Sequence, residues 1–495
     1  MSSPFVRSSA LVLGLGLASA GVWSATPAAP KTVEAAVPAV SGPAVAGPRV
    51  ATEGFADVVA KVTPAVVTIR VEAKASPRYT QMPGGIPEEM FGQLFGQRGQ
   101  RGRQQQEPPA VQRGLGSGVI VSNDGFILTN NHVIDNATSI KVELSDRRVL
   151  DGKLIGADPA SDLAVVKIDA RSLPVIAVGD SNAMRVGDLV LAVGNPLGVG
   201  QTVTMGIVSA KGRATGLGDG SYEDFLQTDA PINQGNSGGA LVNTSGELIG
   251  INSQILSPSG GNIGIGFAVP SNMARNVMDQ LITNGRVHRG LLGVTVQGIT
   301  SDLAAGLGLD KAEGALVSNV TAGGAADQAG IKRGDVILSY QGREVIDTNS
   351  FRNEIAATKP GTTIALNVLR DGKPHEVKAT LSENAAAKDA RGESEGEGHS
   401  GSGRFGMAVE PLTPEIARQL DLDRDTKGVV IADVDPSGAA ASAGLKEGDV
   451  IQQVNGKPVR TAEEVRTALN ASTGKPAVLL IARGEATIFV PLRGR

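Results

Sequence analysis

The chain is 495 residues long, carries a formal net charge of −4 and contains no cysteine. At about 150 residues per domain, this length predicts roughly three domains rather than one core. A charge so close to neutrality disfavours a nucleic-acid partner, and the lack of thiols excludes disulfides and a cysteine nucleophile. The four histidines show no metal-ligand spacing, so we expect neither a metal nor a cofactor.

The first 49 residues predict an exported protein. Arg7 precedes an apolar run over residues 10–23, which small residues follow. The run is shorter than the ~20 residues that span a bilayer, so residues 1–25 resemble a cleaved signal peptide. Residues 26–49 are rich in Pro, Ala and Val and predict a flexible lead-in. We therefore expect no transmembrane anchor in the mature protein.

Strand-length apolar segments follow, separated by Gly, Asn, Asp and Pro. Many short strands without helices between them favour an antiparallel sandwich or barrel. A helix is expected after them, over Ser271–Ile282, with Ser271 as its N-cap. The predicted strands are Val66–Ala73, Gly118–Val121, Phe126–Thr129, Ile140–Leu144, Val149–Ile155, Leu163–Ile168, Leu189–Val193, Thr202–Ala210, Phe225–Thr228, Leu248–Ile255 and Gly264–Val269.

One long polar loop, Lys74–Arg113, interrupts the strands. Its arginines stand among Gln and Gly, which favours a solvated loop over a nucleic-acid contact. Four apolar residues at helical spacing within it predict a contact with another protein surface. These residues are Met90, Phe91, Leu94 and Phe95.

Beyond Arg289 the chain repeats itself. The segment Ala325–Ile337 aligns with Ala439–Ile451 at nine identities in thirteen positions, which predicts two copies of one module of about 90 residues. Residues 384–403 between the copies are mostly Gly, Ser, Ala and Glu, with little to bury. This linker composition predicts that the two copies move independently.

The candidate chemistry lies in the β-rich part. Ser237 stands in Gly235-Asn-Ser-Gly-Gly239, His132 is the only histidine before His288, and Asp162 lies where a turn enters an apolar strand. Taken singly, each has a plainer reading as a turn serine, a structural histidine or a capping aspartate. A serine nucleophile needs a base, however, and the base needs an acid that fixes its tautomer.

The order of these residues along the chain distinguishes a chymotrypsin-like fold from an α/β-hydrolase fold. His132, Asp162 and Ser237 follow the chymotrypsin order, whereas α/β-hydrolases have the order Ser, Asp, His. In this arrangement Ser237 attacks a carbonyl, His132 takes and returns the proton, and Asp162 stabilises the imidazolium. The N–H groups of Gly235 and Ser237 then bind the oxyanion.

With these motifs the chain resembles the HtrA/Do-like family of periplasmic serine endoproteases, the DegP/DegQ/MucD type. The resemblance covers nearly everything after about residue 50. Its carriers, besides the two repeats, are Thr129-Asn-Asn-His-Val133, Ser161-Asp-Leu-Ala-Val165, Gly194-Asn-Pro196, Gln227-Thr-Asp-Ala-Pro-Ile-Asn-Gln-Gly-Asn-Ser-Gly-Gly239 and Gly261-Asn-Ile-Gly-Ile-Gly-Phe267.

The resemblance implies a mainly β fold, namely a chymotrypsin-like double β-barrel protease domain followed by two PDZ domains. The expected boundaries are a protease domain over 50–285, PDZ domains over 286–383 and 404–495, and the linker 384–403 between them. It also implies ATP-independent degradation of unfolded or damaged envelope proteins, chaperone activity, and a homotrimer that builds hexamers or larger cages.

The resemblance further implies residue roles. It assigns His132, Asp162 and Ser237 to the triad and Gly235, Asn236 and Ser237 to the oxyanion loop. It places Ile232 and Ile265 in a shallow apolar specificity pocket, so that cleavage follows small aliphatic residues. It gives Arg213 a regulatory role in sensing a neighbour. The loop that captures C-terminal peptide carboxylates is Leu291, Leu292, Gly293 and Val294.

Two other classes of function compete with a protease. A catalytically silent chaperone or PDZ scaffold would have no need of a complete His, Asp and Ser set. A nucleic-acid binder that used the arginines of the long loop is disfavoured by the signal peptide.

Overall fold

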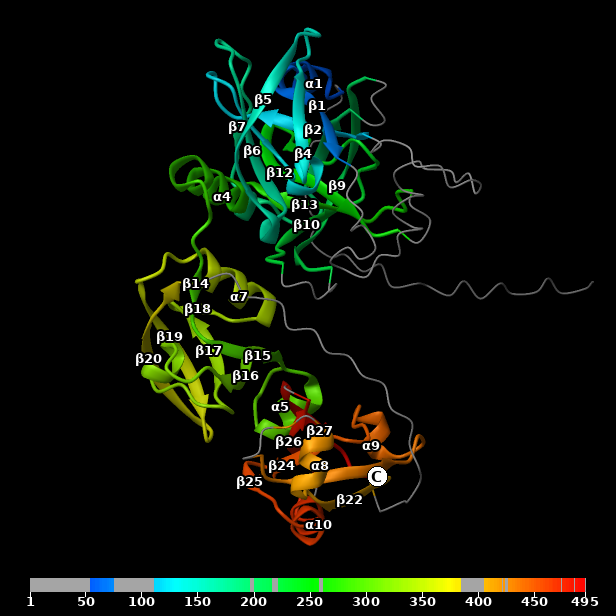
Figure 1. Ribbon diagram of the computed structural model, residues 1–495, viewed down its shortest axis with the longest axis vertical. Coiled ribbons are helices and arrows are strands. Elements are labelled where there is room, and N and C mark those ends of the chain that lie inside the picture. The colour runs from blue at the N-terminus through cyan, green and yellow to red at the C-terminus, as the bar shows by residue number, and fades with distance from the viewer. Residues whose placement is uncertain are drawn as a thin grey trace, which may run out of the picture. The chain divides into compact units, whose positions relative to one another are not determined.

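A computed structural model describes most of the chain from Gly54 onward. The described residues are 54–74, 111–195, 200–215, 221–257, 261–383, 405–420, 422, 426–472, 474–484 and 486–494. The expected signal peptide and lead-in, the apolar residues of the long loop, and the linker lie outside them. The described fold is mainly β, as predicted (Figure 1).

Six antiparallel strands close the first barrel in the order β1-β2-β3-β6-β5-β4. Alternate residues of β1, namely Val67, Ile69 and Val71, face its core, because successive strand side chains point to opposite faces. Short helical turns stand before β1 and between the strands. The elements are α1 (Ala56–Val62), η1 (Thr63–Ala65), β1 (Val66–Lys74), β2 (Val111–Ile120), β3 (Phe126–Thr129), α3 (Asn131–Ile134), β4 (Ala137–Glu143), β5 (Val149–Asp158), η2 (Pro159–Ser161) and β6 (Leu163–Ile168).

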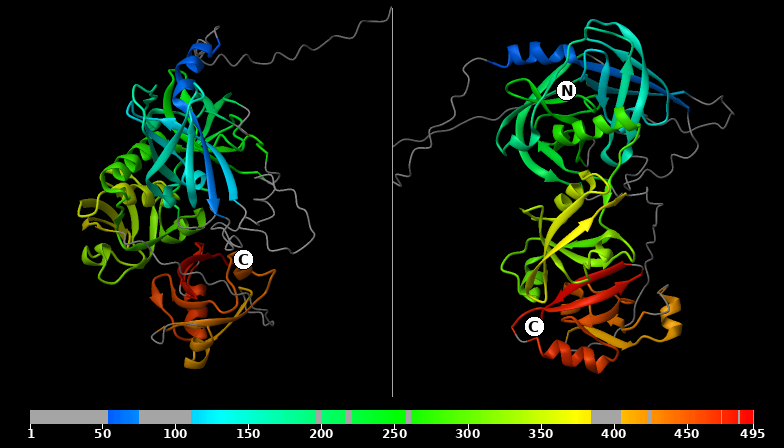
Figure 2. Two further views of the ribbon diagram at one scale, coloured as in Figure 1. Left: turned by 45° about the horizontal axis from the view of Figure 1, so that its top comes forward. Right: turned by 90° about the vertical axis from the view of Figure 1, so that its left-hand side faces the viewer.

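The second barrel is a ring of six strands in the order β11-β8-β9-β10-β13-β12, closed by pairing of β12 with β11, and β7 adds to β12 in parallel. Helix α4 follows and packs against both barrels (Figure 2). The elements are β7 (Ala177–Val178), η3 (Ser181–Ala183), β8 (Leu189–Gly194), β9 (Thr202–Arg213), β10 (Phe225–Thr228), β11 (Ala240–Asn243), β12 (Glu247–Ile255), β13 (Gly266–Pro270) and α4 (Ser271–Asn284).

One hydrophobic cluster joins the two barrels. Val119 and Leu163 of the first barrel pack in it with Leu191 and Leu248 of the second, all four almost fully buried. Burial of this surface fixes the barrels against each other, so that loops from both meet at a defined place. The candidate catalytic residues lie on such loops and on the short helical turn α3.

Two similar domains follow the barrels. We name them the first repeat (residues 290–383) and the second repeat (residues 405–494). Their sheets have equivalent strand orders, β15-β16-β17-β19-β20 and β22-β23-β24-β26-β27. The elements are β14 (Gly290–Leu291), β15 (Val294–Gly298), α5 (Ser301–Leu307), β16 (Ala315–Val320), α6 (Ala325–Gln328), β17 (Val336–Tyr340), β18 (Arg343–Glu344), α7 (Thr348–Ala357), β19 (Thr363–Arg370), β20 (Lys373–Thr380), β21 (Ser382–Glu383), β22 (Met407–Pro411), α8 (Pro414–Gln419), β23 (Val429–Val434), α9 (Ala439–Ser442), β24 (Val450–Val454), β25 (Lys457–Pro458), α10 (Ala462–Asn470), β26 (Ala477–Arg483) and β27 (Ala486–Leu492).

The repeats share a buried apolar cluster, and the expectation that they move independently stays a prediction. Leu303 and Leu316 of the first repeat share a buried cluster with Leu480 and Phe489 of the second. The linker composition describes the connection alone and carries no information about surfaces that pack elsewhere. Burial of these apolar side chains favours the packed arrangement.

Several predicted element bounds differ from the structure. The expected N-cap, Ser271, is instead the first residue of α4, because its hydroxyl donates to the carbonyl of Gly179 at 2.8 Å and Pro270 takes the cap position. Strand β9 runs on to Arg213, since Arg213 pairs with Phe225 of β10. No helix among the described residues is long and apolar enough to cross a bilayer.

Candidate active site

Asp162 holds His132 through both carboxylate oxygens. The Nδ1 atom of His132 lies 2.8 Å from Oδ2 and 3.0 Å from Oδ1 of Asp162, and the His132 backbone N–H donates to Oδ1 at 3.0 Å. A proton on Nδ1 makes this contact a hydrogen bond and leaves Nε2 of the neutral ring as a proton acceptor. The arrangement therefore fixes the ring orientation and the tautomer that a general base requires.

Local structure places the two residues side by side. His132 lies in α3 directly after β3, and Asp162 precedes β6, which pairs with β3. Asp162 adopts the left-handed conformation (φ 53°, ψ 42°), which Asp tolerates better than most residues. Its carbonyl accepts from the Asn131 N–H at 3.1 Å and from Asn130 Nδ2 at 2.9 Å. These bonds join the histidine turn to the aspartate turn.

Ser237 lies on the loop between β10 and β11, and this loop is held against the first barrel. The Ser117 N–H of β2 donates to the Ser237 carbonyl at 2.8 Å. Gly238 follows with φ +82°, and a Cβ atom there would lie 2.1 Å from the Ser117 carbonyl oxygen and 2.3 Å from Thr129 Oγ1. Only glycine fits this contact, so the glycine after the serine seats the loop.

Ser253 of β12 connects Ser237 with Asp162, a contact that the sequence did not predict. Its hydroxyl donates to Asp162 Oδ2 at 2.8 Å, and its carbonyl accepts from Ser237 Oγ at 2.9 Å. Among the described residues, Ser237 makes no hydrogen bond to His132. The three candidate residues therefore meet around Ser253, with the Ser237 hydroxyl turned toward the Ser253 backbone. A lone serine on a strand gives no sequence signal for this role.

The predicted oxyanion loop has two backbone N–H groups without a partner in the described residues. The Asn236 N–H already donates to the Asn233 carbonyl at 3.0 Å, and the Gly235 carbonyl accepts from Ser117 Oγ at 2.6 Å. Within the described residues, no hydrogen bond uses the N–H of Gly235 or Ser237. Gly235 has φ +96°, which favours glycine. Asn236 itself is buried, with its side-chain oxygen unpartnered.

The two isoleucines predicted to line a specificity pocket lie in different surroundings. Ile232 is 2% exposed and packs in the core of the second barrel. Ile265 is half-buried and packs against the cluster between the barrels. Asn262 links their loops by donating to the Ile232 carbonyl at 3.2 Å. The structure does not bring the two side chains into one cluster, and their role stays a prediction.

The predicted carboxylate loop has an ordered backbone. The carbonyls of Leu292 and Gly293 accept from the N–H groups of Ala326 and Thr321, and Gly293 has φ +78°. Leu292 is buried, whereas the neighbouring Leu291 side chain is exposed. The second repeat has the same pattern, with the Phe405 and Gly406 carbonyls bound by Ala440 and Asp435. Val294 then begins β15.

Arg213 is the last residue of β9 and its side chain is exposed. Within the described part of the chain it makes no ion pair or side-chain hydrogen bond. Its proposed regulatory role therefore stays a prediction.

The electrostatics of the pair suit a base. Desolvation lowers the pKa of His132, but the charge of Asp162 and its hydrogen bond outweigh this effect and raise the pKa above its ordinary value. Because 39% of the His132 side chain is exposed, desolvation is only partial and Asp162 sets the net direction. The described residues contain no group of three or more His, Asp or Glu arranged to hold a metal.

Comparison with known proteins agrees with this geometry. The chain matches the trypsin-like peptidase domain over residues 116–251 and PDZ domains over residues 290–381 and 430–483. These matches define the class: a trypsin-like serine peptidase with two PDZ domains, which the first and second repeats form.

Individual relatives narrow the class. The chain is 42% identical over 450 residues to the probable periplasmic serine endoprotease DegP-like of Chlamydia pneumoniae, covering 89% of each chain. It is 42% identical over 493 residues to the periplasmic pH-dependent serine endoprotease DegQ of Escherichia coli K12, covering 98% of each. The HtrA-type protease AlgW, solved with a tripeptide, is 42% identical with a TM-score of 0.55, covering 68% of this chain and 99% of that one.

These similarities show the family. The chain belongs to the HtrA-type, DegP-like periplasmic serine endoproteases. Its described residues contain both the peptidase barrels and the two PDZ domains of that family.

Proposed function

We propose that Ser237, His132 and Asp162 hydrolyse peptide bonds in unfolded or damaged envelope proteins, without ATP. The observation that carries the proposal is the Asp162 carboxylate, which binds His132 Nδ1 and accepts from Ser253, whose carbonyl holds Ser237. Attack requires the Ser237 hydroxyl to turn from Ser253 toward His132 Nε2.

The reaction then follows from the groups present. Ser237 Oγ bonds to the scissile carbonyl carbon while its proton passes to His132, and the oxyanion accepts from the N–H groups of Gly235 and Ser237. His132 returns the proton to the leaving amine, which leaves an acyl-serine. Water repeats the sequence and restores Ser237, so that one peptide bond is exchanged for an acid and an amine.

The substrate proposal joins the catalytic site to the first repeat. A loop with ordered carbonyls and a glycine at positive φ suits capture of a C-terminal carboxylate, at Leu291, Leu292, Gly293 and Val294. AlgW was solved with a tripeptide and with a decapeptide, which supports peptide binding by this chain. We keep the proposal that cleavage follows small aliphatic residues. Of the two isoleucines, the half-buried Ile265 is the one that a substrate side chain could contact, because Ile232 is 2% exposed.

A paired digestion tests the proposal. One protein substrate is supplied unfolded and folded, and product termini are mapped by mass spectrometry. We expect rapid cleavage of the unfolded form, with mainly Val, Ala, Ile or Thr before the cut. Ser237→Ala should lower turnover by about 10⁶-fold while retaining the fold. Full activity in Ser237→Ala would refute the triad, and a dominance of Arg or Phe would refute the pocket.

The proposal also includes chaperone activity and assembly as a homotrimer, with hexamers or larger cages. Ser237→Ala should still suppress aggregation of an unfolded protein, because binding does not need the nucleophile. Deletion of residues 76–109 should leave a trimer and remove larger assemblies in light scattering. If Ser237→Ala does not reduce aggregation of the unfolded protein, chaperone activity is refuted. If the loop deletion leaves the assembly states unchanged, the loop has another role.

A further inference from the structure

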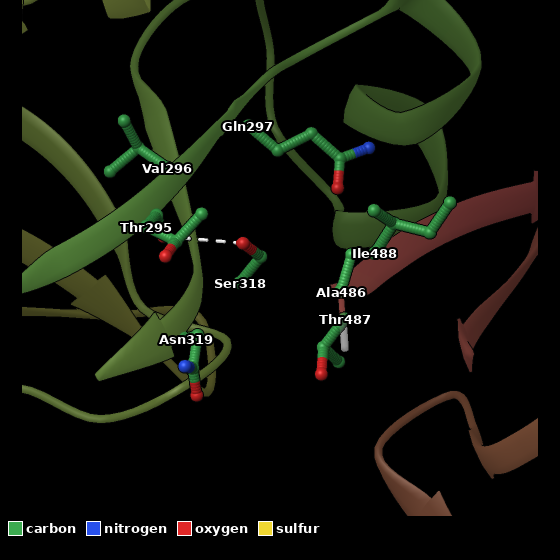
Figure 3. A pocket seen from close by; sticks show the side chains of 8 residues that line it. All are labelled: Thr295, Val296, Gln297, Ser318, Asn319, Ala486, Thr487 and Ile488. Atoms are coloured by element: carbon green, nitrogen blue, oxygen red, sulfur yellow. Dashed lines mark hydrogen bonds between the residues drawn. The ribbon is translucent and has the colours of Figure 1, made fainter. Parts of the chain in front are cut away.

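A cleft of about 400 Å³ lies between the two repeats (Figure 3). Residues 295–297 of β15 and 318–319 of β16 line one side, and residues 486–488 of β27 line the other. None of these side chains is charged, so a charged group entering the cleft would lose water without gaining a partner. The cleft therefore suits an uncharged ligand.

At one end of the cleft, the side-chain amide of Gln297 forms hydrogen bonds of the kind that a neighbouring strand would form. Its Nε2 donates to the Phe489 carbonyl at 2.8 Å, and the Phe489 N–H donates to its Oε1 at 2.9 Å. The side-chain amide thus satisfies both backbone groups of Phe489, as a peptide unit of a neighbouring strand would. The backbone groups of Phe489 consequently point to the free edge of β27, away from β26.

Strand alternation identifies the next open position on that edge. In an antiparallel pair, backbone groups alternate between the two sides, so residues 487, 489 and 491 all face the free edge. Pro491 agrees with this pattern, since it has no N–H and would be tolerated there. Val478, which pairs with Pro491, exchanges its backbone bonds with Asn455 instead. Thr487 therefore presents its N–H and carbonyl to the cleft.

The edge of β27 is blocked at two positions and open at one. Gln297 satisfies Phe489, and Pro491 offers no donor. Within the described residues, Thr487 makes no backbone hydrogen bond outside its own sheet, and the alternation turns its N–H and carbonyl away from β26. Proteins usually protect such edges because an open edge adds strands from other chains. We propose that the cleft binds an extended, uncharged segment of an unfolded polypeptide, which pairs with Thr487 and packs over Thr295 and Asn319.

The position of the cleft indicates which part of the bound polypeptide enters it. Strand β15 begins directly after the carboxylate loop, and Thr295 lies two residues beyond Gly293, a rise of about 7 Å. A substrate whose C-terminus is held at Gly293 would reach the cleft with residues a few positions upstream. The inference rests on the proposed peptide capture, and it adds the second repeat as a part of the same binding site.

Peptide binding to the full chain carrying Ser237→Ala tests the inference, because that chain cannot cleave the probe. The probes are a fluorescent decapeptide of uncharged residues with a free C-terminus and its C-terminal tripeptide. We expect the decapeptide to bind at least tenfold more tightly in fluorescence anisotropy. Thr487→Pro, which removes the N–H at a position where an edge strand tolerates proline, should abolish most of that gain. Thr487→Val should keep it, and neither variant should change tripeptide affinity.

The outcomes separate the two proposals. Three chains are compared, all carrying Ser237→Ala: one with Thr487 unchanged, one with Thr487→Pro and one with Thr487→Val. If all three bind the decapeptide with equal affinity, the cleft site is refuted and peptide capture still stands. If neither probe binds, peptide capture fails and the cleft inference fails with it. N-methylation of single decapeptide amides tests the same edge without altering the protein. Losses at alternate upstream positions support strand addition, and uniform affinity contradicts it.

Discussion

At the scale of single residues, Ser253 contacts two candidate catalytic residues, one through its side chain and one through its backbone. Its hydroxyl holds Asp162 and its carbonyl holds Ser237. Ser253→Ala should lower kcat by about tenfold, the scale of one lost hydrogen bond, and leave KM nearly unchanged. Ser253→Thr keeps the hydroxyl and should keep most of the activity. Equal kcat in Ser253→Ala and wild type, measured on a peptide substrate, would exclude a positioning role.

Two glycines at positive φ allow the cost of backbone strain to be measured apart from the cost of a steric overlap. Gly238 (φ +82°) faces the Ser117 carbonyl, whereas a Cβ atom at Gly264 (φ +89°) meets nothing within 4 Å. Both alanine variants carry a backbone cost of about 1–2 kcal/mol. Gly238→Ala should destabilise the chain by roughly 1–3 kcal/mol more, because of the overlap. Similar midpoints of urea unfolding for both variants would contradict the close approach.

At the scale of elements, each repeat contains a buried arginine–aspartate ion pair at the equivalent position. Arg370 binds both carboxylate oxygens of Asp335 at 2.7 and 2.6 Å, and Arg483 binds Asp449 at 2.7 Å twice. Each carboxylate is almost fully buried and each arginine also donates to a loop carbonyl. The pair ties the start of one strand to the end of another in the same way in both copies.

Removal of one partner should be costly. Arg370→Met leaves the Asp335 charge buried, and we expect a loss of about 3 kcal/mol in the free energy of unfolding. Adding Asp335→Asn removes that charge and should recover most of the loss. Arg493→Met breaks an exposed pair with Asp302 and should cost less than about 1 kcal/mol. A single Arg370→Met variant as stable as Arg493→Met would refute this account.

Sequence patterns predicted elements better than contacts between them. Phe126–Thr129, Leu163–Ile168 and Phe225–Thr228 have the predicted bounds, because apolar runs ended by turn residues are a local signal. Strand β11 was missed since its four residues follow directly on Gly238 and Gly239. Ser253 was missed because its partners lie 91 and 16 residues away, and only closure of both barrels brings them together.

At the scale of the whole molecule, a group of acidic residues lies between the second barrel and the first repeat. Burial raises the pKa of Asp224 to about 6, Asp347 and Glu354 of the first repeat add to the rise, and Lys211 opposes it. Beside them, the Glu223 carbonyl accepts from the amides of Asn349 and Asn353 at 2.7 and 2.6 Å.

The raised pKa of Asp224 predicts a stability that depends on pH. The folded state binds the Asp224 proton more tightly than the unfolded state, so its contribution is full below the ordinary pKa of Asp and is lost as pH rises through about 6. Thermal unfolding should show Asp224→Asn gaining stability relative to wild type between pH 4 and pH 7. Asp188, whose pKa is lowered by hydrogen bonds to Arg185, is the control of opposite sign. A pH-independent difference between Asp224→Asn and wild type would contradict the prediction.

The central claim is that Ser237 is a nucleophile activated by His132, and covalent labelling tests it most directly. A fluorophosphonate probe forms a stable bond only with an activated serine, and peptide mass spectrometry locates the adduct. We predict one adduct, on Ser237, that disappears in Ser237→Ala and forms much more slowly in His132→Ala and Asp162→Asn, whereas Ser253→Ala still labels. Labelling of another serine, or labelling of Ser237 at an equal rate in His132→Ala, would contradict the proposed mechanism.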